Sequence, residues 1–273
     1  MTSIDTGTQD LLARKENGVG YLVMNRPEAR NAMSQEMNKA MQETITAFEL
    51  DNEVRCIVLT GAGKGFCAGG DVKGMASRGD GTVGDNTIDA AIHKQRDHQR
   101  ATSGKLFKMP KPTIASLSGA AAGAGLSYAL SCDLRIMSSE AFMTTAFAKV
   151  GFSGDYGGSY FMTQLIGSAK ARELYFLSDR ISADHALELG LTNWVVEPDD
   201  LELKTKEIAE KLASGPAVAF RYMKENLNRA MHGDVDDCLD LEATHHIHCG
   251  QTHDHKNAVK AFVEKKEPIF EGK

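Results

Sequence analysis

The sequence has few cysteines, no long hydrophobic run and no signal-like start. Its five cysteines are scattered and odd in number, so they suggest no disulfide framework and are typical of reduced thiols in a cytoplasmic protein. The apolar stretches are far shorter than a membrane span, and the first ten residues lack the basic start and apolar run of a signal peptide. We therefore predict a soluble, cytoplasmic protein with no membrane partner.

An excess of basic charge is also missing. Lys and Arg total 31 against 37 Asp and Glu, which gives a net charge of −6, and the longest basic run is the pair Lys265 and Lys266. Such a surface does not favour nucleic acid or an anionic membrane. We expect no nucleic-acid partner, and any anionic ligand must be held by a local site.

The hydrophobic content of 42% over 273 residues is enough for a sizeable core, and its pattern is that of an α/β fold. Between the first two predicted strands, Met37, Met41, Ile45 and Phe48 recur at helical spacing, with Ser34 as a candidate N-cap. The predicted strands are residues 19–24, 54–60, 113–117 and 134–137.

Beyond about residue 168 the sequence becomes mainly helical, and residues 194–196 are the last strand candidate. We therefore predict two parts, an α/β core over residues 1–200 that holds the site and a helical C-terminal region over residues 201–273.

Two stretches rich in glycine and alanine each follow a predicted strand. Residues 61–75 read GAGKGFCAGGDVKGM, and residues 119–125 read GAAAGAG. Neither matches a Walker loop or GxGxxG. Backbone N–H groups in such loops, and at a helix start, can bind a developing negative charge, and two of them side by side would form an oxyanion hole. A simple turn and close helix packing remain open alternatives.

Four segments together resemble a known family. Residues 25–33 (NRPEARNAM), 63–72 (GKGFCAGGDV), 119–136 (GAAAGAGLSYALSCDLRI) and 261–270 (AFVEKKEPIF) resemble, in order and spacing, the enoyl-CoA hydratase/isomerase family, the crotonase superfamily. The resemblance implies a crotonase-like spiral of repeated ββα units and a helical C-terminal region that builds a homotrimer or homohexamer. It also implies an acyl-CoA thioester as substrate, with coenzyme A as part of it, no tightly bound cofactor and no metal.

The same resemblance assigns individual residues. Ala68 and Ala124 match the two oxyanion donors, whose backbone N–H groups hold the thioester oxygen. Phe262 and Lys265 match C-terminal residues that reach the nucleotide, often from a neighbouring subunit. The residues that match the rest of the coenzyme A site are Arg30, Ala68, Gly70, Asp71 and Val72. Asp71 is expected to fix this loop rather than to perform chemistry.

The sequence departs from the family pattern at the catalytic acids. Hydratases of the family use two glutamates, and the matching positions here are Ser127 and Phe147, neither of which can transfer a proton usefully. Asp155 lies where allylic isomerases carry their single carboxylate, and the local sequence looks most like the isomerase of bacterial phenylacetate breakdown. We therefore predict that Asp155 moves a proton within a 3-enoyl-CoA to give the 2-enoyl-CoA. Phe147, Phe152 and Tyr156 would surround it with apolar groups and raise its pKa.

Several other interpretations stay open. Asp155 could be a nucleophile, as in dehalogenases and hydrolases of the superfamily, but those enzymes also use a histidine where this chain has Arg100, with His98 two residues away. The protein could also be a hydratase-type member with weak hydratase activity, or a non-catalytic acyl-CoA or RNA-binding relative. Before any resemblance is considered, an aspartate ahead of Tyr-Gly-Gly is typical of an N-cap or Asx-turn.

Two further segments are notable. Residues 244–255 hold five histidines and a cysteine, but their spacing matches no named zinc pattern, so we predict no metal site. Residues 75–86 are polar and glycine-rich, which suggests a loop beside the acyl site.

Overall fold

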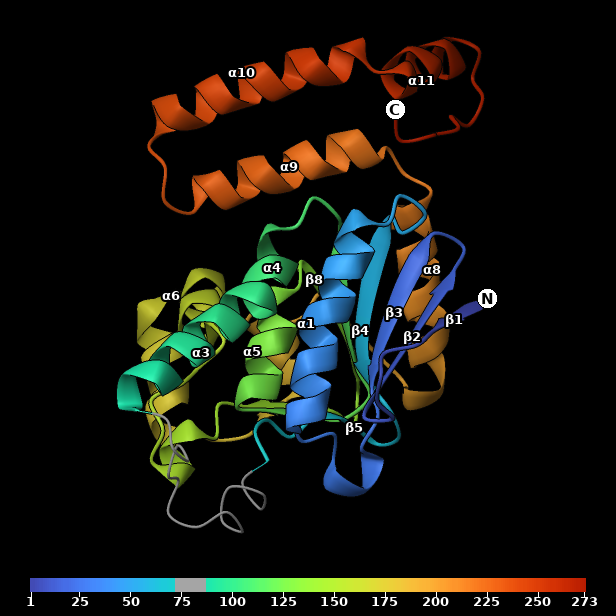
Figure 1. Ribbon diagram of the computed structural model, residues 1–273. Helices are drawn as coiled ribbons and strands as arrows, with labels where there is room; N and C mark the ends of the chain where they lie inside the picture. Colours follow the sequence, from blue (N-terminus) through green and yellow to red (C-terminus); the bar gives the residue numbers. More distant parts are fainter. Residues whose placement is uncertain (72–86) are drawn as a thin grey trace.

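The computed structural model describes residues 1–71 and 87–273; Val72 and the loop predicted over residues 75–86 lie outside the described residues (Figure 1). The strands are β1 (Thr2–Ile4), β2 (Leu11–Glu16), β3 (Val19–Met24), β4 (Cys56–Gly61), β5 (Gly65–Cys67), β6 (Thr113–Leu117), β7 (Ala120–Ala122), β8 (Leu134–Ser138), β9 (Phe142–Thr144), β10 (Ile181–Ser182) and β11 (Trp194–Val196). The helices are η1 (Pro27–Ala29), α1 (Gln35–Leu50), α3 (Ile88–Ala101), α4 (Ser103–Lys108), α5 (Ala124–Ser131), η2 (Phe147–Val150), α6 (Gly158–Leu177), α7 (Ala183–Glu188), η3 (Pro198–Asp200), α8 (Leu201–Ala213), α9 (Ala217–Ala230), α10 (Val235–Gln251) and α11 (His253–Val263).

The strands form two sheets that the chain visits in turn. The larger sheet has the order β1-β2-β3-β4-β6-β8-β11, and the smaller one has the order β10-β9-β7-β5. The chain passes from β4 to β5, from β6 to β7 and from β8 to β9, and each pair is followed by helical structure. β3, β4, β6 and β8 pair in parallel. This mixed α/β architecture confirms the predicted repeat of ββα units.

The central strands β3, β4, β6 and β8 of the larger sheet are buried on both faces. Successive side chains of a strand point to opposite faces, so each strand contributes to both. On β4, Ile57 and Leu59 belong to the apolar cluster that contains α1, whereas Val58 belongs to the cluster that contains α8. Helix α1 begins as predicted, since the backbone N–H of Met37 donates to the Ser34 hydroxyl at 3.0 Å. The alternation of apolar residues therefore holds the sheet between two helical layers.

The C-terminal helices differ in what they contact. Helix α8 packs on the larger sheet through Leu201, Ala209 and Ala213. Helices α9, α10 and α11 lie together beyond one end of the sheets, at the top of Figure 1. We keep the boundary near residue 200 as a proposal for how the chain is divided along the sequence. In the structure, α8 packs with the core, and the helices that lie outside it begin at α9. Over the described ranges, no helix combines the length and apolar character needed to cross a membrane.

Candidate active site

Two turns of the chain meet at the ends of β5 and β7, which pair in parallel with Cys67 opposite Ala121. The approach is close enough that side chains would not fit. A Cβ placed on Gly125 would lie 2.4 Å from the Cys67 carbonyl oxygen, and one on Gly69 would lie 3.3 Å from the Ala124 nitrogen. Gly69 also has a φ of +90°, which favours glycine. The two predicted glycine-rich loops therefore lie side by side.

The free donors at this junction differ in part from those predicted. Ala124 is the first residue of α5, so its N–H has no partner within the helix, and it has no other acceptor in the described ranges. The Ala68 N–H, which was predicted to bind the thioester oxygen, donates to the Arg30 carbonyl at 3.0 Å in this structure. Two residues on, the Gly70 N–H has no acceptor among residues 1–71 and 87–273.

Replacing Gly125 by alanine is expected to push the two turns apart, because the new methyl group would overlap the Cys67 carbonyl. We expect the free energy of unfolding to fall by about 2 to 3 kcal/mol, the upper range for overpacking. Chemical denaturation measures this loss. Gly250 is a matched control, since a Cβ there meets no atom within 4 Å; Gly250→Ala should leave stability unchanged or raise it. Equal stability of the two variants would contradict the packing described.

Asn31 holds the first turn in place, a role that the sequence analysis did not identify. It is fully buried with a φ of +56°, and its side-chain amide donates to the carbonyls of Ala62 and Gly65 at 2.9 and 2.8 Å. Its oxygen accepts from the Arg26 N–H at 2.9 Å. The asparagine after Arg30 in the quoted motif was the available signal, but only the fold shows what it binds.

Two of the residues predicted to bind coenzyme A, Arg30 and Asp71, have contacts that define this turn. Asp71 accepts from the Arg26 guanidinium at 3.2 Å, in keeping with its expected role in fixing the loop. Arg30 has a left-handed backbone with φ +53°, its carbonyl is bonded to Ala68, and its side chain is exposed. The guanidinium is therefore available to an anionic ligand.

Asp155 lies in the turn between η2 and α6, and its surroundings decide between its possible roles. Helix α6 is capped by the backbone of Gly157 without any side-chain bond, so Asp155 is not an N-cap. Its Oδ1 is buried and has no hydrogen-bond partner within the described part of the chain. Burial raises the pKa of the carboxyl to about 6. A half-buried carboxylate with an unbonded oxygen is suited to accept a proton near neutral pH.

Contacts of the neighbouring residues place Asp155 beside α5. The ring centroids of Tyr156 and of Tyr128 on α5 lie 5.0 Å apart, and a Cβ placed on Gly158 would lie 2.3 Å from the Ser127 hydroxyl oxygen. Burial is the main cause of the raised pKa of the Cys67 thiol, about 12, and of the Tyr128 hydroxyl, and the charge of Asp155 adds to both. Cys67 directly precedes the first turn, and Tyr128 lies on α5. The carboxylate therefore lies near both chain segments that carry the free N–H groups.

Aromatic rings line the surroundings of Asp155. Phe147 is buried and stacks on Tyr175, with centroids 6.0 Å apart and planes at 18°. Its ring lies 3.6 Å from a Cβ placed on Gly123 and 3.9 Å from one on Gly154, so it separates the start of α5 from the Asp155 turn. Tyr156 is buried as expected, but Phe152 is 58% exposed, so its predicted place in the apolar lining is wrong. The chain turns at Gly151 and carries Phe152 outward.

Neither position that matches a hydratase glutamate carries an acid or a base. Ser127 is buried on α5, and its hydroxyl donates back to the Gly123 carbonyl at 3.3 Å. Phe147 presents only a ring. Of the carboxylates at these turns, Asp71 is paired with Arg26, whereas Asp155 has a buried Oδ1 without a partner in the described ranges.

Phe262 and Lys265 lie far from Asp155 in a single chain. Phe262 is on α11 and is 84% exposed, and Lys265 follows the helix and is also exposed. Figure 1 places α11 beyond one end of the sheets, whereas β5 and the start of α1 lie toward the other end. The structure therefore brings Arg30, Ala68, Gly70, Asp71, Ala124 and Asp155 to one region but not these two residues.

The histidine-rich segment forms part of the contact between α9 and α10. His245 is buried, stacks on Tyr222 with centroids 4.1 Å apart, and bonds to Asn226 through Nδ1. Within the described residues, no group of three or more His, Cys, Asp or Glu side chains could hold a metal ion.

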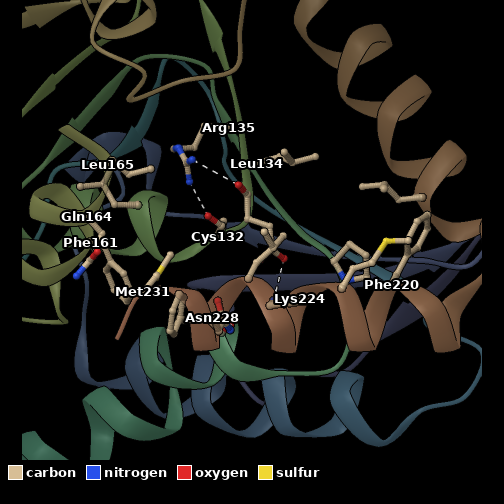
Figure 2. A pocket seen from close by; sticks show the side chains of 17 residues that line it. Cys132, Leu134, Arg135, Phe161, Gln164, Leu165, Phe220, Lys224, Asn228 and Met231 are labelled. Carbon is tan, nitrogen blue, oxygen red and sulfur yellow. Dashed lines mark hydrogen bonds and ion pairs between the residues drawn. The ribbon is translucent and has the colours of Figure 1, made fainter. Parts of the chain in front are cut away.

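A separate cavity of about 430 Å³ lies between α9 and the core (Figure 2). Its lining is mostly apolar and includes Phe161, Leu165, Phe220 and Met231. At one side Lys224 pairs with Asp133 at 2.8 Å. None of the predicted site residues lines it, so it is distinct from the candidate site described above.

This chain belongs to the enoyl-CoA hydratase/isomerase family, whose model matches residues 14–273. It is 37% identical to the short-chain-enoyl-CoA hydratase of Clostridium acetobutylicum over 94% of this chain and 95% of the relative. It is 34% identical to the 1,2-epoxyphenylacetyl-CoA isomerase of Escherichia coli over 96% of this chain and 98% of the relative. The crystal structure of an enoyl-CoA hydratase from Bacillus anthracis matches with a TM-score of 0.88 and 30% identity over 97% of this chain and all of the other. The family acts on coenzyme A thioesters, and both hydratases and an isomerase are among the relatives.

Proposed function

We propose that this protein is an acyl-CoA isomerase that converts a 3-enoyl-CoA into the conjugated 2-enoyl-CoA. The observation that carries the proposal is the half-buried carboxylate of Asp155, whose pKa is raised to about 6 and whose Oδ1 has no partner in the described chain. An isomerisation of this kind consumes no water and needs one group that can both take and return a proton.

In the proposed reaction, Asp155 takes a proton from the α-carbon, and the electron pair of that bond moves toward the thioester oxygen. The N–H groups of Gly70 and Ala124 stabilise the negative charge on this oxygen. Asp155 then returns the proton to the γ-carbon, so the double bond moves into conjugation and the carboxylate is restored. The apolar rings of Phe147 and Tyr156 keep water away from the dienolate.

A hydratase is the alternative suggested by several relatives' names. Hydration needs one group to activate water and another to deliver a proton. Ser127 bonds to its own helix and Phe147 has no ionisable group, so the usual pair is missing. We therefore propose that hydratase activity is weak or absent.

The nucleophilic role of Asp155 needs a base to activate water against the aspartyl ester. Arg100 is exposed and cannot serve as a base. Both ring nitrogens of His98 are already bonded, Nδ1 to the Tyr156 hydroxyl at 3.0 Å and Nε2 to the Asn38 carbonyl at 2.9 Å. These contacts favour proton transfer over the dehalogenase or hydrolase alternative.

We further propose that coenzyme A binds along residues 68–72 with Arg30 near its phosphates, and that Phe262 and Lys265 reach the nucleotide from a neighbouring subunit. Within one chain, α11 lies beyond the end of the sheets opposite to β5, so its residues would complete the site of a neighbouring subunit rather than their own. The assembly would then be a homotrimer or a homohexamer.

The decisive experiment follows the absorbance of the conjugated thioester when the protein is mixed with a 3-enoyl-CoA. We expect turnover to rise with pH around a midpoint of about 6, because Asp155 must be ionised to accept the first proton. With a 2-enoyl-CoA, hydration should be slow at every pH. Fast hydration with no isomerisation would contradict the proposal.

A further inference from the structure

The turn that carries Asp155 is held by helix α3. Tyr156, the next residue, donates its backbone N–H to the side-chain oxygen of Gln99, and its hydroxyl bonds to His98 Nδ1 at 3.0 Å. The rings of His98 and Tyr156 meet edge to face, with centroids 5.6 Å apart. Two adjacent residues of α3 therefore bind the backbone and the side chain of the same tyrosine.

The backbone of this turn needs such support. Gly154, Tyr156 and Gly157 have φ values of +115°, +49° and +78°, all in the left-handed region. Glycine tolerates that region, but a tyrosine there costs about 1 to 2 kcal/mol and persists only when its surroundings hold it. The bonds to His98 and Gln99, together with the packing of the buried ring on Tyr128, offset this cost.

The hydrogen bonds of His98 fix where its protons lie. The Asn38 carbonyl can only accept, so His98 Nε2 carries the proton and donates it at 2.9 Å. In the neutral ring Nδ1 then accepts from the Tyr156 hydroxyl. His98 thus connects α1 to the catalytic turn and has no free nitrogen for chemistry.

We propose that His98 and Gln99 are positioning residues, which fix the carboxylate of Asp155 through Tyr156; this inference rests on the proposed role of Asp155. The carboxylate has no hydrogen bond of its own at Oδ1 within the described residues, so its location depends on the turn. A base that serves two carbons in succession must be well placed, and a displacement of about 1 Å can cost about 100-fold in rate.

The first test uses Gln99. Gln99→Met removes the acceptor of the Tyr156 N–H, and we expect kcat to fall by about 10- to 100-fold with KM changed less than about 2-fold. Gln99→Glu keeps an acceptor oxygen, so it should restore most of the rate. Its added negative charge should also shift the pH midpoint of turnover upward. Equal loss in both variants, or a loss expressed mainly in KM, would overturn the proposal.

The second test is a double-mutant cycle between His98→Ala and Tyr156→Phe. Because the two changes break the same hydrogen bond, their effects on kcat should be clearly less than additive. His93→Ala is the matched control, since His93 is an exposed histidine on the same helix, and it should behave as the wild type. Additive effects of His98 and Tyr156 would overturn the proposal.

An activity-independent readout separates this inference from the proposed function. The titration of the Asp155 carboxyl, followed by NMR with ¹³C-labelled aspartate, should have a midpoint that changes in Gln99→Met and not in His93→Ala. If the wild type fails to turn over 3-enoyl-CoA, the proposed function is wrong, yet this titration still tests the positioning. An unchanged midpoint in Gln99→Met would refute the positioning even in an active enzyme.

Discussion

Asp155→Asn is expected to lower the proposed isomerase turnover by about 10³- to 10⁴-fold, because the amide can neither take nor return a proton. General acid–base catalysis by one group contributes typically about 10² to 10⁴, and here the same group serves both steps. Steady-state kinetics with a 3-enoyl-CoA measures the loss, which should lie in kcat. KM should change little, since asparagine keeps the size of the side chain. Turnover within about 10-fold of wild type would remove Asp155 from the mechanism.

The same variant should be more stable than the wild type at neutral pH. The folded protein raises the pKa of Asp155 from 3.8 to about 6, so it binds the proton more tightly than the unfolded chain does. Between about pH 4 and pH 6 this group therefore lowers the free energy of unfolding as pH rises. Above about pH 6 the free energy of unfolding stays lowered by the whole amount. Because the carboxylate is partly exposed, we discount the effect and expect Asp155→Asn to raise the free energy of unfolding by about 1 to 2 kcal/mol above pH 6. Below about pH 4 we expect no gain in the free energy of unfolding. Denaturant titrations at pH 4 and pH 7.5 test both ends.

Ala124→Pro is the second large effect that we expect, with a loss of about 10²- to 10³-fold in kcat. Proline removes the N–H that would hold the thioester oxygen, and loss of one oxyanion donor costs about this much. Proline is well tolerated at the first position of a helix, so α5 should still form. The measurement is again turnover of 3-enoyl-CoA, with circular dichroism to follow the fold.

Ala183→Pro is the matched control for that variant. Ala183 is also the first residue of a helix, α7, whose N-cap is Ser182. The change should leave turnover within about 2-fold of wild type. If Ala124→Pro were folded and equally active, the Ala124 N–H would have no part in holding the thioester.

Most of the fold was predictable because local patterns agreed with one another. The strand at residues 19–24 and the Ser34 cap appear where the sequence placed them, since alternation and capping depend on nearby residues. The contact of α8 with the sheet was not predictable in the same way. An amphipathic pattern shows that a helix has an apolar side but not what covers it.

The candidate site was predictable in its residue types more than in its contacts. The position of Asp155 relative to the family motifs identifies it as a candidate in the sequence. That its Oδ1 has no hydrogen-bond partner depends on how the chain packs around it, which the sequence does not show. Ala68 and Gly70 are nearly equivalent in the sequence, and only the distant carbonyl of Arg30 distinguishes them. In the sequence, His98 is notable only because it lies two residues from the position of a base in dehalogenases of the superfamily. Its bond to Tyr156 joins segments far apart in the chain, so the sequence does not show it.

The junction of Gly69, Ala124 and Gly125 also bears on how such a protein can change during evolution. The free N–H groups of Gly70 and Ala124 belong to the main chain, so a side-chain replacement other than proline leaves them in place. Close packing restricts Gly69 and Gly125 to glycine. The proposed acid–base group, by contrast, is the side chain of Asp155, which a single substitution exchanges. Under the proposed mechanism, a protein of this family can keep both backbone donors and change its reaction through the position of one carboxylate.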